Sequence, residues 1–252
     1  MKTPFLELAE NVNKLKVKAT GYDLSNYKTM LKNVLIRLND YFVKNGFYEY
    51  NDYSQLIDML ITNPKYYFQI NSKLPTSVRG RFYKSTIKNN GHIEINRNSF
   101  YDLENTEGYL CHEFIHLISL GMDYITYFDN GKKVEIVLPD NVGLKAGYKK
   151  YYLKDGKTET QILTYSDLCA NSFLKEGLTE LLKQQIYDAM SSPPTYQIQT
   201  RFIEFLNFAS GCKLEQSFKD FLQGDLVTYK KSINKRRIFK TWQRVKTFFR
   251  RI

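Results

Sequence analysis

Two of the three histidines in this 252-residue chain, His112 and His116, lie four residues apart in the segment LCHEFIHL (110–117). On a helix, a four-residue step returns to nearly the same face, so both imidazoles can point at one ion. The apolar residues around them recur at helical spacing: Leu110, Phe114, Leu117 and Ile118. Such a stripe would hold the helix inside a domain. The segment therefore predicts a buried helix that presents two metal-ligating imidazoles.

The residues around this pair predict the rest of a metal site. Glu113 would project beside the ion, where it can take a proton from a metal-bound water. A catalytic zinc site needs a third protein ligand, and no histidine follows His116, so we expect a carboxylate. Glu176 is the preferred candidate, because it lies on a second helix with its own apolar stripe. Asp123, shortly after the first helix, is the competing candidate.

Glu180 lies four residues after Glu176 and therefore on the same face of the second helix. We expect its carboxylate to accept a hydrogen bond from the other ring N–H of a ligand histidine, because metal-bound histidines usually have such a partner. Gly177 lies between the two acids and costs a helix interior about 1 kcal/mol relative to alanine. That cost is reasonable where two helices, or a helix and a ligand, approach closely.

The combination of HEFIH at 112–116 with EGLTE at 176–180 resembles the gluzincin metallopeptidases, a clan that includes thermolysin-like proteases and one-zinc aminopeptidases. The resemblance implies a zincin-like fold and the hydrolysis of peptide bonds in a peptide or protein substrate. By position, it implies that His112, His116 and Glu176 bind a single Zn²⁺. It also implies that Glu113 is the general base and that Glu180 orients a ligand histidine.

The implied mechanism assigns further roles. Glu113 would accept a proton from the zinc-bound water and pass it to the leaving amine. The tetrahedral oxyanion needs another donor, usually a tyrosine or a histidine beyond the third ligand. Since no histidine remains there, Tyr196 is the first candidate and Tyr187 the second. The strand expected at 91–96 would lie at the cleft edge and pair with extended substrate backbone. His92, in that strand, is interpreted as a surface or cleft residue.

The order of the predicted elements indicates an α+β fold, with helices, a small antiparallel sheet and then helices again. Residues 5–62 should be helical, with one buried face that comprises Leu31, Val34, Leu35, Leu38, Tyr41 and Phe42. Short alternating runs at 80–86 and 92–96 predict a hairpin. Later helices are expected at about 105–120, 166–190, 196–209 and 214–222.

We expect three regions along the chain: an N-terminal helical region at 1–62, a zincin-like catalytic core at 63–225 and a basic amphipathic C-terminal helix at 226–252. The 59 residues between His116 and Glu176 exceed the spacing usual in well-known gluzincins. Strand-like segments at 133–138, 149–153 and 160–163 therefore predict a small antiparallel insertion at about 129–165.

The formal charge of +11 is concentrated in the C-terminal segment, which holds ten of the 37 basic residues and no acidic residue. The rest of the chain is nearly neutral, with 27 basic and 26 acidic residues. Apolar residues recur in this segment at steps of four and three, at Ile238, Trp242, Val245, Phe249 and Ile252. Such a helix suits an anionic membrane surface, an acidic partner or, as a weaker alternative, nucleic acid.

Several absences bear on localisation. No apolar run approaches the roughly 18 residues that a membrane-spanning helix needs. Residues 1–18 lack the apolar centre of a secretion signal. The three cysteines are odd in number and widely spaced, which does not favour a disulfide framework; Cys111 is interpreted as a packing residue. We therefore expect a cytoplasmic protein, with peripheral membrane association through 226–252 as a further hypothesis.

Two other functions remain open from the sequence. The chain could be a non-catalytic zincin-like or binding protein that acts through its basic C-terminal helix, at a membrane surface or on nucleic acid. A protease effector that acts on a host is a third hypothesis, although no export route is evident in the sequence. Metal content and the effect of a Glu113→Gln substitution separate the enzyme from the binding protein.

Overall fold

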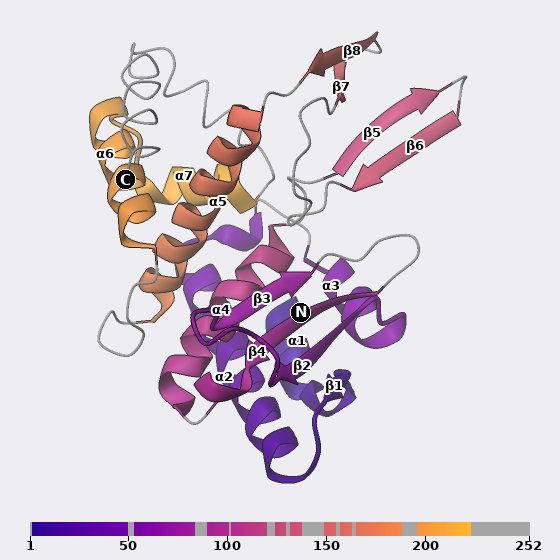
Figure 1. The fold of residues 1–252 in the computed structure, drawn as a ribbon, viewed down its shortest axis with the longest axis vertical. Helices are drawn as coiled ribbons and strands as arrows, with labels where there is room; N and C mark the ends of the chain where they lie inside the picture. The colour runs from indigo at the N-terminus through magenta and orange to yellow at the C-terminus, as the bar shows by residue number, and fades with distance from the viewer. Residues whose placement is uncertain are drawn as a thin grey trace.

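The computed structural model describes residues 2–49, 53–83, 90–100, 102–119, 124–129, 132–137, 149–154, 157–162, 165–187 and 196–222. Within these ranges the protein is α+β, as predicted, with a small sheet packed among helices (Figure 1). The alternative ligand Asp123 and the expected helix at 226–252 lie outside the described residues. Among the described helices, none combines the length and the apolar character needed to cross a membrane.

The N-terminal part consists of α1 (Pro4–Glu10), the long α2 (Gly21–Lys44) and the short α3 (Gln55–Ile57), which runs on into a π-helical turn at Asp58–Thr62. The predicted face of α2 is confirmed, because five of its six residues are buried: Leu31, Val34, Leu35, Leu38 and Phe42. Tyr41 is partly buried against the same core. This part is not wholly helical, since it also contains the two-residue strand β1 (Val17–Lys18).

The four-stranded sheet has the order β1-β2-β4-β3, in which β2 is Tyr66–Asn71, β3 is Gly80–Tyr83 and β4 is Gly91–Asn96. The predicted pairing of the 80–86 and 92–96 segments is confirmed, since β3 and β4 are antiparallel. The prediction of an antiparallel sheet is wrong, because β1, β2 and β4 run parallel to one another. The three successive aromatic residues at 66–68 obscure the alternation that would have revealed β2.

The histidine helix is α4 (Leu103–Ile118), which contacts β3 and β4 of the sheet and also packs against α2. It begins at Leu103, two residues before the predicted start near residue 105, and its N-cap is Asp102. The Asp102 carboxylate accepts a hydrogen bond from the backbone N–H of Asn105, at 3.2 Å. In the first turn of the same helix, the Thr106 hydroxyl donates to the backbone carbonyls of Ser99 and Asp102.

Two antiparallel hairpins separate α4 from the next helix. The first joins β5 (Tyr124–Asp129) to β6 (Lys132–Val137), and the second joins β7 (Lys149–Lys154) to β8 (Lys157–Ile162). Figure 1 shows both hairpins outside the four-stranded sheet. Antiparallel strands are therefore present where they were predicted, but there are four strands where three segments were expected, and the first begins at Tyr124 rather than near residue 129.

Three helices complete the described chain: α5 (Tyr165–Ile186), α6 (Gln197–Ser210) and α7 (Leu214–Leu222). Helix α5 packs against α4, α6 and α7. The buried apolar side chains form one cluster that extends from Phe5 to Leu222. In its centre, the ring of Phe114 on α4 lies 6.3 Å from that of Phe5 and 6.4 Å from that of Phe68. The histidine helix is thus held by the core on more than one side.

Candidate metal centre

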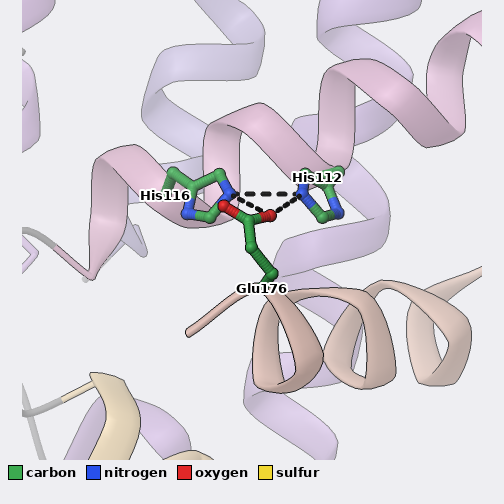
Figure 2. A group of neighbouring side chains, drawn as sticks. All are labelled: His112, His116 and Glu176. Carbon is green, nitrogen blue, oxygen red and sulfur yellow. Dashed lines mark hydrogen bonds and ion pairs between the residues drawn. The ribbon is translucent and has the colours of Figure 1, made fainter. Parts of the chain in front are cut away.

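His112 and His116 on α4 and Glu176 on α5 converge on one point (Figure 2). The Nε2 atoms of the two histidines are 3.2 Å apart. The Glu176 Oε2 atom lies 3.2 Å from Nε2 of His112 and 3.3 Å from Nε2 of His116. These side chains could hold a metal ion, since each offers a ligand atom to the same small volume. The expected convergence of the two helices is therefore present in the structure.

Burial around this cluster is uneven. The His112 and His116 side chains are each only 6% exposed, whereas the Glu176 side chain is 26% exposed. The imidazoles are held in the interior because the apolar residues beside them belong to the core: Leu110, Phe114, Leu117 and Ile118. Glu176 is thus the member of the cluster that faces solvent.

Glu180 makes the contact that its spacing predicted. Its Oε2 atom lies 3.1 Å from Nδ1 of His112, and its side chain is fully buried. A carboxylate accepts, so Nδ1 carries the proton of this hydrogen bond, and Nε2 is the ring nitrogen that faces His116 and Glu176. The other oxygen of Glu180 lies 2.7 Å from Nζ of Lys183, which is also fully buried.

The acidic groups strongly affect the ionisation of His112. Burial alone would lower the pKa of His112, but hydrogen bonds with Glu176 and Glu180 outweigh burial and raise it to about 10. Burial would likewise raise the pKa of Glu180, but His112 and Lys183 lower it to about 2. The pKa of Glu176 is also lowered, because the two histidines outweigh the effect of its burial. The site is therefore strongly suited to hold positive charge.

His116 is fixed by two neighbours that sequence analysis missed. The Oγ1 atom of Thr179 on α5 lies 3.5 Å from Nδ1 of His116. The ring of Phe82 on β3 is nearly parallel to the His116 imidazole, with 6.4 Å between centroids and 14° between planes. Neither residue carried a signal in the sequence, because both contacts depend on how distant elements pack.

Glu113, the predicted general base, follows His112 on α4 and is 9% exposed. Its side chain lies against Gly80 on β3: a Cβ atom at Gly80 would stand 3.1 Å from Oε1 of Glu113. Strand β3 is the edge strand on this side of the sheet. The prediction that residues 91–96 form the cleft edge is therefore wrong, because β4 is an inner strand that pairs with β2 and β3.

Tyr196, the first candidate for the oxyanion donor, lies at the cluster. Its ring stacks on the imidazole of His112, with 5.3 Å between centroids and 18° between planes. Burial raises the pKa of Tyr196, and the charge of Glu176 together with a hydrogen bond to that carboxylate raises it further. The second candidate, Tyr187, is engaged elsewhere, since its hydroxyl donates to Glu107 at 3.5 Å.

Two other residues considered from the sequence lie outside the cluster. His92 is stacked between the rings of Tyr67 and Tyr83, with centroid distances of 5.0 Å and 4.3 Å. Cys111 is fully buried in the core. Burial raises the pKa of its thiol, so it behaves as a packing residue.

Among the residues that the structure describes, His112, His116 and Glu176 form the one group of His, Cys, Asp and Glu side chains arranged to hold a metal ion. Comparison of the chain with protein-family models, with curated proteins and with solved structures finds no match.

Proposed function

We propose that this protein is a zinc-dependent metallopeptidase with a gluzincin-like active site. The observation that carries the proposal is the spacing of the three donor atoms. Zinc bonds to nitrogen and oxygen are about 2.0–2.1 Å long, so two ligands of a tetrahedral ion are about 3.3–3.4 Å apart. The three donor atoms of His112, His116 and Glu176 are separated by 3.2, 3.2 and 3.3 Å. The donor set therefore fits one tetrahedral cation with a fourth position for water.

The chemistry of the donor atoms also supports a cation. The His112 Nδ1 atom donates to Glu180, so Nε2 is the ring nitrogen that would bind an ion once it has lost its proton. The Nε2 atom of His116 lies only 3.2 Å away. Without a metal, the acidic groups around His112 favour a proton there, as its raised pKa indicates, and a divalent cation would take the place of that proton. A set of two imidazoles and one carboxylate is also the ligand set that zinc has in thermolysin-like catalytic sites.

Within this proposal, the zinc would acidify a water molecule and polarise the scissile carbonyl. Glu113 would accept the proton of that water, because it directly follows His112 and lies close enough for its charge to raise the pKa of that imidazole. Glu113 would then pass the proton to the leaving amine. Glu180 holds His112 in the tautomer that leaves Nε2 available as a ligand.

The remaining groups would bind the substrate. The Tyr196 hydroxyl lies next to Glu176 and keeps its proton, since its pKa is raised by burial and by that carboxylate. It can therefore donate a hydrogen bond to the oxyanion of the tetrahedral intermediate. One edge of β3 pairs with β4, and within the described residues no strand pairs with the other edge. An extended peptide added there would pass beside Glu113.

Metal analysis and one substitution test the proposal. The full chain should contain one zinc ion per molecule and should cleave members of a peptide library, with cleavage lost on chelation and restored by zinc. Glu113→Gln should retain the zinc and lose hydrolysis, by about 100-fold or more, because it removes only the proton acceptor. Glu204→Gln, the same change at an exposed position on α6, is the matched control.

Two results would contradict the proposal. The first is a chain that binds no zinc at micromolar concentration. The second is a Glu113→Gln variant that cleaves peptides as fast as the Glu204→Gln control. If the chain binds zinc but cleaves no peptide in the library, the proposed activity is wrong, and the result favours a zincin-like binding protein with a non-catalytic metal centre.

A further inference from the structure

Lys183 on α5 is buried to an unusual degree for a lysine. Its exposed fraction is 0%, and its Nζ atom lies 2.7 Å from Oε1 of Glu180, whose side chain is also 0% exposed. Removing an ammonium and a carboxylate from water costs several kcal/mol for each ion, and their attraction often fails to offset that cost. A well-packed apolar pair of similar volume would serve the fold at least as well. The pair therefore suggests a role other than stability.

The role follows from where the two oxygens of Glu180 point. Its Oε1 atom contacts Lys183 and also accepts a hydrogen bond from Nε2 of Gln184, at 3.2 Å. Its Oε2 atom contacts Nδ1 of His112, at 3.1 Å. One carboxylate is thus held at one end by α5 and bonded at the other end to the histidine of α4.

We propose that Lys183 is a positioning residue of the candidate metal centre: by binding Oε1 of Glu180 it holds Oε2 on Nδ1 of His112, and so fixes the imidazole with Nε2 toward the ion. The inference rests on the proposed function for the identity of the metal. Lys183 touches neither substrate nor metal and acts only through Glu180. Loss of a hydrogen-bond partner behind a metal ligand typically weakens metal binding 10- to 100-fold.

The effect of Lys183 on zinc affinity should reverse in sign when residue 180 carries an amide in place of its carboxylate. In Glu180→Gln, the Lys183 ammonium and the Gln184 amide N–H both face the Oε1 position, so the amide carbonyl turns toward them and the NH₂ group turns toward His112. Nδ1 of His112 must then accept, and its proton moves to Nε2, where it blocks the metal. With Lys183→Met added, the carbonyl is free to turn back to His112 and the ligand lone pair is restored.

The test measures zinc affinity by competition with a chelating dye for the full-length wild type, Lys183→Met, Glu180→Gln and the double variant. We expect Lys183→Met to lower the affinity about 10-fold in the wild-type background and to raise it several-fold in the Glu180→Gln background. In urea unfolding of the metal-free proteins, the double variant should be at least as stable as the wild type. Lys32→Met, the same change at an exposed position on α2, should alter neither quantity.

Each outcome decides between the alternatives. A lysine that served only the fold would lower stability in both backgrounds and would show no reversal in zinc affinity, and that result would overturn the inference. If Lys183→Met alone does not fold, the comparison of Glu180→Gln with the double variant is sufficient, and an affinity that does not rise overturns the inference. Zinc binding without peptide cleavage would refute only the proposed activity, whereas a wild type that binds no zinc would refute both.

Discussion

Gly80 lies so close to Glu113 that no larger residue fits without a shift: a Cβ atom there would stand 3.0 Å from Cγ and 3.1 Å from Oε1 of that glutamate. Gly80→Ala should therefore displace the carboxylate by a few tenths of an ångström. We expect kcat for peptide cleavage to fall roughly tenfold, because small misplacements of a reacting group are costly. Zinc content, measured by metal analysis, should not change, since no ligand moves.

Gly21→Ala is the matched control for that substitution. A Cβ atom at Gly21 meets nothing within 4 Å, but its φ of +56° is a conformation that alanine adopts poorly. The control should lose about 1 kcal/mol of unfolding free energy and keep its kcat. Equal kcat values for the two variants would show that Glu113 does not depend on the close approach of β3.

Gly177 allows α5 and α6 to approach closely, as its position between the two acids predicted. A Cβ atom there would lie 2.9 Å from the backbone carbonyl oxygen of Gln199 and 2.9 Å from Cγ1 of Ile203. Because a backbone atom cannot move aside alone, Gly177→Ala should push α6 outward and cost about 1–3 kcal/mol of stability. Urea unfolding measures that loss, and a variant as stable as the wild type would contradict the close packing.

Tyr196→Phe separates the two contacts of that tyrosine. The ring can still stack on His112, but the hydroxyl that bonds to Glu176 is lost. We expect kcat at saturating zinc to fall about 10- to 100-fold, because the hydroxyl would donate to the oxyanion. Tyr187→Phe, which removes the hydroxyl that donates to Glu107, should leave kcat unchanged. Comparable kcat values for the two variants would exclude Tyr196 as the oxyanion donor.

Glu94 should make the fold sensitive to acid. Its side chain is only 3% exposed, and its Oε2 atom accepts hydrogen bonds from Gln69 and Asn71, at 2.9 and 2.7 Å. Burial would raise the pKa of Glu94, but these bonds and His92 lower it to about 2, from 4.5 in the unfolded chain. Since the folded pKa is the lower one, the stabilisation is complete above pH 4.5 and is lost as the pH falls from 4.5 toward 2.

The matched variant for that effect is Glu94→Gln, which has no charge to titrate. Between pH 7 and pH 3 the wild type should lose about 2 kcal/mol more unfolding free energy than the variant. Urea titrations of both proteins at several pH values measure the difference. Parallel losses in the two proteins would mean that the carboxylate has the same proton affinity in the folded and unfolded states.

Local spacing was sufficient to predict the parts of the site that lie on single helices. A four-residue step fixes the relation of His112 to His116, and of Glu176 to Glu180, wherever the helices pack. The apolar stripes beside these residues also predicted that both helices would be buried. For the same reason the burial of the apolar face of α2 was predicted correctly.

What depends on distant packing could not be predicted in this way. Strand β2 joins β4 in parallel register, and this pairing is set by the tertiary fold rather than by local pattern. The sequence therefore pointed to β4 as the edge strand, where the fold has β3. Lys183 gave no signal either, because a lysine three residues after a glutamate usually lies on a solvated helix face. Only its burial reveals the contact with Glu180.

The third donor of the cluster, Glu176, follows His116 after 59 intervening residues. An ion bound to both would tie the ends of that long segment together, as a covalent cross-link does. Closing a loop of about 60 residues in the unfolded chain corresponds to about 4 kcal/mol of lost chain entropy. The segment between the two donors includes both hairpins, so its length can vary at little energetic cost while the tie keeps α4 and α5 in register.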